Sequence, residues 1–107
     1  GGTSWIVPNH FIYPKAYGHK TVKKQNQLEK RYKDLYKNLM PQIISGNLNG
    51  IIYTELNDCE TECNGIYTLD REVLKIDKDL IIDINKEIEA KRMKWYYEAI
   101  HIRKNYW

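Results

Sequence analysis

The stretch that decides the fold is Asn49-Gly50-Ile51-Ile52-Tyr53-Thr54-Glu55, near the middle of a 107-residue chain. Its β-branched and aromatic residues form a short, nearly continuous apolar run, which is typical of a strand buried on both faces. Strands of this kind belong to parallel sheets that carry helices on the outside. Residues 49–55 are therefore predicted to be a strand of an α/β fold.

A helix is predicted over residues 24–45, before this strand. Its apolar residues recur at the spacing of one helical face, namely Leu28, Tyr32, Leu35, Tyr36, Leu39 and Ile43. Pro41 lacks a backbone donor, so it is expected to kink the last turn or to end the helix early. Gly46 is placed to cap the C-terminus.

A polar loop and a second helix are predicted after the strand. Residues 56–72 are mostly polar, and a second apolar stripe begins after Asp79. Asp77 or Asp79 is the expected N-cap, and the helix is predicted to reach about residue 103 or to break near Ala90. Residues 1–22 are expected to be an irregular loop. One strand cannot form a sheet alone, so the chain is predicted to be part of a larger barrel or to associate with copies of itself.

Charge and composition point to a cytoplasmic protein without a membrane or nucleic-acid partner. The net charge is +3, which is too weak to require an anionic partner. No stretch has the order of a signal peptide, and no apolar run approaches the ~18 residues of a membrane span. Two cysteines, Cys59 and Cys63, are too few for a disulfide scaffold, which favours free thiols in the cytosol.

Residues 48–75 carry a long ungapped motif that includes Tyr53-Thr54-Glu55, Asp58, Glu60, Glu62 and Asn64-Gly65, and that ends in Asp70-Arg71 and Lys75. This stretch resembles the eighth barrel strand and the following loop of family 2 glycoside hydrolases, the β-galactosidase and β-glucuronidase family. The family pattern there is G-x-x-Y-T-Q-x-x-D-x-E-x-E-x-N-G-L-x-T-Y-D-R-x-V-x-K. Gly1-Gly2-Thr3-Ser4-Trp5 is similar to the segment that follows the family's seventh strand.

The resemblance implies the last part of a (β/α)₈ TIM barrel, with helix 7, strand 8 and helix 8, rearranged if the rest of the barrel is missing. It covers residues 1–78 as a C-terminal segment of a glycosidase-like barrel, and residues 79–107 form a terminal helical segment. By the family pattern the nucleophilic Glu would lie two positions before Gly1, and the acid/base Glu further upstream. Retaining glycosidases need both carboxylates ~5 Å apart, so this chain is not expected to be catalytic alone.

The resemblance also implies the sugar-binding residues of the parent enzyme. Tyr53 matches the aromatic residue at the end of the eighth strand, and Trp5 would lie near the sugar in the loop after the seventh. Glu55 stands where the family commonly has Gln, and its carboxylate would either accept a sugar hydroxyl or mark a different substrate. Leu69 replaces a common Tyr, so the substrate stays open between β-galactosides and β-glucuronides. For Tyr53 and Trp5, the alternative interpretation is simple packing.

No metal or other cofactor is predicted. The carboxylates Glu55, Asp58, Glu60 and Glu62 could bind a hard cation, but they lack the spacing of an EF-hand loop. Cys59 and Cys63 have no nearby histidine in the sequence to complete a zinc site. A solvated acidic loop is the favoured interpretation.

Two functional hypotheses follow. In the first, the chain is the C-terminal fragment of a retaining β-glycosidase, and its partner is the carbohydrate substrate of the full-length parent. In the second, it is an independent small protein that forms a homo-oligomer or binds a partner through its aromatic helices. The basic aromatic segment that includes Lys91, Arg92 and Trp95 raises a third interpretation, a nucleic-acid or membrane-surface module, which Glu87, Glu89 and Glu98 disfavour.

Overall fold

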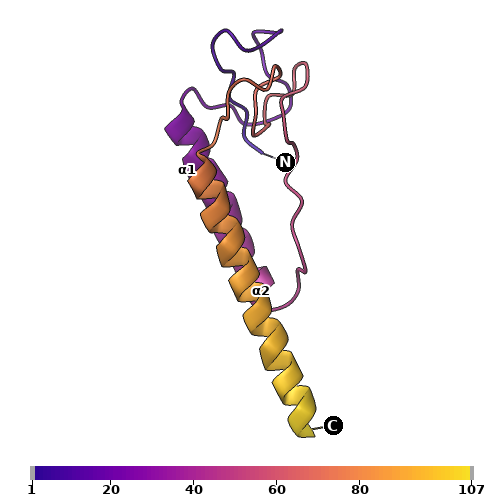
Figure 1. Cartoon of the computed structure of the whole chain (residues 1–107). Coiled ribbons are helices and arrows are strands. Elements are labelled where there is room, and N and C mark those ends of the chain that lie inside the picture. Colours follow the sequence, from indigo (N-terminus) through magenta and orange to yellow (C-terminus); the bar gives the residue numbers. More distant parts are fainter. Residues whose placement is uncertain (1, 107) are drawn as a thin grey trace.

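The structure is a computed structural model that describes the backbone of residues 2–106 and the side chains of residues 2–101. It contains two long helices, α1 (Gln25–Ile44) and α2 (Lys78–Tyr106). Figure 1 shows that the two helices run side by side in the same direction, and that the segments before α1 and before α2 gather at the end where both helices begin. We call residues 2–24 and 56–77 the loop region. The molecule is elongated, with extents of 60 × 25 × 20 Å.

The predicted α/β barrel fold is wrong for this chain. Across residues 2–106 the structure has no strand and no sheet, only isolated bridges such as Ser4 to Thr21 and Tyr67 to Leu74. Hence the described chain contains no barrel strand 8 between a helix 7 and a helix 8, and its architecture is a pair of helices with a loop region.

Residues 49–55 show why the strand prediction failed. They form an extended return from the end of α1 to the loop region, visible in Figure 1 as the long thin segment beside the helices. Ile51 and Tyr53 pack against the helices, whereas the side chain of Ile52 is 93% exposed. The apolar run is thus buried on one face and not on two. A strand also needs a neighbouring ladder of hydrogen bonds, and among the described residues this segment has no bridge, only a single backbone hydrogen bond from the N–H of Ile66 to the carbonyl of Glu55.

Helix α1 agrees with the predicted range. Leu28, Tyr32, Tyr36 and Ile43 are its buried residues, as the apolar stripe indicates. The helix continues through Pro41 to Ile44 and does not stop before it. Gly46 then closes it in the left-handed conformation (φ 77°), with its N–H donating to the carbonyl of Ile43 at 3.1 Å.

Helix α2 begins where an aspartate can cap it. The Asp77 carboxylate accepts hydrogen bonds from the backbone N–H groups of Asp79 (2.7 Å) and Leu80 (3.3 Å), so Asp77 is the N-cap. The helix does not break near Ala90 and reaches Tyr106. It packs on α1 through a core of Leu28, Tyr32, Tyr36, Ile76 and Ile84. Neither helix, as far as the structure describes it, is both long and apolar enough to cross a membrane.

A buried ion pair organises the loop region. The Lys75 side chain is fully buried, and its ammonium donates to both carboxylate oxygens of Asp58 (2.7 and 2.9 Å) and to the carbonyl of Cys63 (2.8 Å). Asp58 also accepts from the backbone N–H of Gly65 at 2.8 Å. All three ammonium donors are used, which offsets the cost of burying the charges. The pair therefore fixes the 58–65 loop against the segment that leads into α2.

Candidate functional site

The three residues predicted to bind sugar all form hydrogen bonds with one short segment, residues 63–66. The Tyr53 hydroxyl donates to the carbonyl of Asn64 at 3.0 Å. The backbone N–H of Trp5 donates to the carbonyl of Cys63 at 2.9 Å, and the carbonyl of Glu55 accepts from the N–H of Ile66 at 3.1 Å. The fold thus brings residues from distant parts of the sequence into one neighbourhood.

Of these three residues, Tyr53 lines a cavity between the N-terminal segment and α1. The cavity has a volume of about 260 Å³ and lies between the N-terminal segment, α1 and Tyr53. We call it the Tyr53 cavity; it is lined by Gly2, Thr3, Leu28, Arg31, Tyr32, Asp34, Leu35, Asn38 and Tyr53. Gly2 lies at its edge, and a Cβ there would be only 2.6 Å from the Tyr53 hydroxyl oxygen, so a larger residue would require the Tyr53 side chain to shift.

The floor and walls of the Tyr53 cavity combine aromatic rings with polar groups. Tyr53 meets Tyr32 edge to face, with the ring centroids 5.4 Å apart. Arg31, Asp34 and Asn38 follow one another at spacings of three and four residues, so α1 presents a guanidinium, a carboxylate and an amide on one face. The Arg31 Nε donates to the Thr3 hydroxyl at 3.3 Å, which ties the N-terminal segment to the helix.

The protonation states in this cavity follow from burial and from one neighbouring lysine. Burial, with smaller effects from Tyr36, Asp58 and Glu55, raises the pKa of Tyr53 to about 12, so its phenol stays neutral at pH 7. The hydrogen bond from Lys30 (2.9 Å) lowers the pKa of the exposed Asp34 carboxyl. The cavity therefore offers a carboxylate acceptor, cationic and amide donors, and neutral rings.

Glu55 and Trp5 do not line the cavity. Glu55 Oε1 is buried and has no hydrogen-bond partner among the described residues. Burial is the main cause that raises the pKa of the Glu55 carboxyl, and the nearby Glu62 and Asp58 raise it further. The Trp5 side chain packs at the edge of the helix core, which agrees with the packing alternative for that residue.

Sequence reasoning missed the polar residues of α1 that line the Tyr53 cavity. Arg31, Asp34 and Asn38 lie on the hydrophilic face of an amphipathic helix, and such a face is usually solvated. The available signal was their helical spacing next to Tyr32, but nothing in the sequence shows that the N-terminal segment covers them. Their role depends on a contact between segments about 30 residues apart.

Two further groups bear on cofactor binding. Cys59 and Cys63 are both free thiols, Cys59 exposed and Cys63 buried, and Asp58 is already paired with Lys75. Within the part of the chain that the structure describes, the residues that bring three metal-ligating atoms together are His10, Asp70 and Glu72. Of these three residues, Asp70 forms an ion pair with His10.

Comparison with known proteins adds no relative. No protein-family model matches the chain, and no curated protein matches it. Functional inference therefore depends on the residues and their geometry.

Proposed function

We propose that this chain is the C-terminal part of a retaining β-glycosidase, and that its own contribution is to bind one sugar ring in the Tyr53 cavity. The sequence motif at residues 48–75 suggests the substrate class, β-glycosides. The barrel fold is not part of what we propose for this chain. The observation that carries the proposal is the position of Tyr53, the motif's aromatic residue, at a cavity that also holds Arg31, Asp34 and Asn38.

The chemistry of this cavity suits a pyranose. A sugar ring has apolar C–H faces and a rim of hydroxyls that both donate and accept hydrogen bonds, so it matches aromatic side chains beside a few polar groups. Asp34 would accept from hydroxyls, while Arg31 and Asn38 would donate to them. A volume of about 260 Å³ lies just below the ~300–1,000 Å³ of pockets for drug-sized ligands, which favours a single ring.

Binding without hydrolysis is the expected behaviour of this chain. Retaining glycosidases use two carboxyl groups about 5–5.5 Å apart, one as the nucleophile and one as the acid/base. The residues that line the Tyr53 cavity include a single carboxylate, Asp34. Cleavage of the glycosidic bond would therefore need carboxylates from elsewhere in the proposed parent enzyme.

The test is a titration of the chain with methyl β-galactoside and methyl β-glucuronide, followed by NMR. Because the contacts are few, we expect a Kd of the order of millimolar, ~4 kcal/mol of binding free energy. Asn38→Ala should weaken binding about 5- to 10-fold, since it removes one hydrogen bond worth ~1 kcal/mol. Asn85→Ala is the matched control, an exposed helical asparagine on α2 outside the cavity.

Two results would reject sugar binding at this cavity. One is the absence of binding to either glycoside at tens of millimolar. The other is equal binding by the Asn38→Ala and Asn85→Ala variants. A preference for the glucuronide would point to Arg31, because a guanidinium pairs well with the sugar carboxylate.

A second candidate function is self-association through the far end of α2. Gly46, just after α1, contacts Trp95, so the residues of α2 beyond Trp95 continue past the end of α1, as Figure 1 shows. Tyr96 and Tyr97 there are 51% and 62% exposed. Exposed neighbouring aromatic residues on a projecting helix are typical of contact surfaces.

Light scattering combined with a thermal melt tests this second candidate. A dimer mass with a cooperative melt is the expected result if the projecting end of α2 associates. Replacing Tyr96 and Tyr97 by Ser should then return the chain to the monomer. The same change at the exposed Tyr13 and Tyr17 of the loop region is the control and should leave the mass unchanged. A monomer at all concentrations would exclude self-association.

A further inference from the structure

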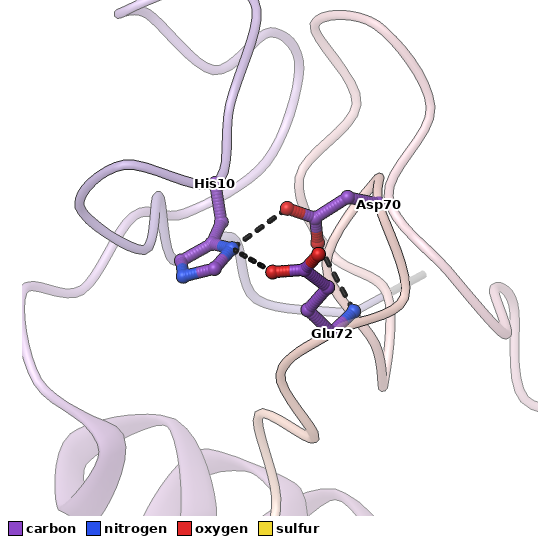
Figure 2. Close-up of side chains that lie close together, drawn as sticks. All are labelled: His10, Asp70 and Glu72. Carbon is purple, nitrogen blue, oxygen red and sulfur yellow. Dashed lines mark hydrogen bonds and ion pairs between the residues drawn. The ribbon is translucent and has the colours of Figure 1, made fainter.

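Three metal-ligating side chains from distant parts of the sequence converge outside the Tyr53 cavity. Figure 2 shows the ring of His10 facing the carboxylates of Asp70 and Glu72. The His10 Nδ1 lies 2.7 Å from Asp70 Oδ2 and 3.9 Å from Glu72 Oε2. One ligand atom from each of the three residues lies within 4.8 Å of the other two. The site therefore joins the N-terminal segment to a turn about 60 residues later.

The Asp70 carboxylate is held in a fixed orientation. Its Oδ1 accepts from the hydroxyl of Thr68 at 2.6 Å and from the backbone N–H of Glu72 at 3.1 Å. Thr68 is fully buried, so this anchor is part of the interior of the loop region. Because Oδ1 is occupied in this way, Oδ2 is the oxygen left to face His10.

Hydrogen bonding alone does not account for the position of Glu72. A neutral imidazole carries one N–H, and the Nδ1 proton can be donated to Asp70 at 2.7 Å. The 3.9 Å to Glu72 Oε2 is too long for a hydrogen bond. The Glu72 side chain is 72% exposed, yet its carboxylate is turned toward a second carboxylate, where like charges repel. A cation between the two, either a protonated His10 or a bound metal ion, would remove that repulsion.

We propose that His10, Asp70 and Glu72 bind one divalent transition-metal ion, with Zn²⁺ as the best match. The donors are one imidazole nitrogen and two carboxylate oxygens, which is a common ligand set for zinc. Ligand atoms at ~2.0–2.2 Å from a tetrahedral ion are about 3.4 Å from one another. The observed separations of 2.7 and 3.9 Å from the His10 nitrogen lie on either side of that value.

The ion would replace the His10–Asp70 hydrogen bond and take the imidazole in its neutral form. Three protein ligands leave the fourth position of the ion for water. Because the ligands come from both segments of the loop region, bound metal would clamp the N-terminal segment onto the 68–72 turn. The folded chain would thus be stabilised by an amount that rises with the logarithm of the free metal concentration once this exceeds Kd.

The test is calorimetric titration of the chelator-treated chain with ZnCl₂, combined with a thermal melt. We expect one ion per chain, a micromolar Kd and a higher Tm with zinc. His10→Ala should weaken binding at least 10-fold. His19→Ala is the matched control, because this second histidine of the same segment faces a single carboxylate, that of Glu62 at 3.5 Å, and should bind zinc as the unchanged chain does.

Glu72→Gln keeps the test decisive if His10→Ala does not fold. Glu72 is exposed, so its replacement should spare the fold while weakening zinc binding about 10-fold. The absence of binding heat and of a Tm shift would overturn the proposal. So would zinc that binds equally to the Glu72→Gln, His10→Ala and His19→Ala variants, because such zinc would lie at another place on the chain.

Discussion

Replacement of Lys75 by Met should remove a large part of the stability of this chain. Met has a similar length and keeps the apolar stem packed, but it has no ammonium. Asp58 would then remain buried with a single hydrogen-bond donor among those described, the N–H of Gly65. Breaking a buried ion pair from one side costs about 3–5 kcal/mol, because the remaining charge has no compensation. A chain of this size has ~5–15 kcal/mol in total.

The stability loss of Lys75→Met should depend on pH, because the Asp58 carboxyl is buried. Desolvation already raises the pKa of Asp58 in the folded state above its unfolded value of ~3.9, and the loss of Lys75, which lowers this pKa, would raise it further. A group with a raised pKa in the folded state contributes stability below the unfolded pKa and loses it as pH rises through the folded pKa. The deficit of Lys75→Met should therefore be largest near neutral pH and smaller near pH 4.

Urea unfolding followed by circular dichroism measures both effects. Lys86→Met, at an exposed position of α2, is the control and should change the unfolding free energy by less than ~0.5 kcal/mol. The double variant Lys75→Met with Asp58→Asn should recover about 2 kcal/mol, since it removes the buried charge but keeps an acceptor for Gly65. A loss below ~1 kcal/mol for Lys75→Met, or no recovery in the double variant, would refute this account of the pair.

Three further predictions concern single positions. Gly65→Ala should cost about 1–3 kcal/mol of unfolding free energy, because a Cβ there would overlap the backbone of residues 57–58; Gly50→Ala, where a Cβ meets nothing within 4 Å, is the control for a urea melt. Asp77→Ala should cost ~1 kcal/mol, since it removes the N-cap of α2, and Asp77→Asn should restore most of that loss in the same melt. The Tyr53 phenol has a pKa of about 12 in the folded chain, whereas the same phenol in the unfolded chain ionises near pH 10. The free energy of unfolding should therefore fall between about pH 10 and pH 12. Tyr53→Phe should flatten this fall in urea midpoints measured against pH, and an unchanged slope would contradict the burial of the phenol.

The helices were predictable because their signals are local. The apolar stripe of α1, the capping glycine at 46 and the Asp77 cap all lie within a few residues of the elements that they define. The strand was not predictable in the same way. Ile51 to Tyr53 has strand composition, but strand formation depends on neighbours that the segment does not have here. The local sequence favours an extended conformation here, but it cannot supply the neighbouring strand that a hydrogen-bonded ladder requires.

The candidate site was predictable only in part. Tyr53 was identified through the motif at residues 48–75 and does line a cavity. Arg31 and Asn38 were not, because a polar helix face gives no sign of which segment covers it. The burial of Lys75 was also unforeseen, since its partner Asp58 is 17 residues away in a stretch that looked like a solvated acidic loop.

The parallel orientation of the two helices has an electrostatic consequence. In an antiparallel pair the helix dipoles oppose and largely cancel, whereas in this pair they add. The partial positive charges of both N-termini lie at the loop region, next to Asp77, Asp79 and the carboxylate of Glu29, which accepts from the N–H of Asp77 at 2.9 Å. Asp77 and Asp79 thus lie at the positive pole of the helix pair, where the peptide dipoles of the backbone stabilise their negative charges.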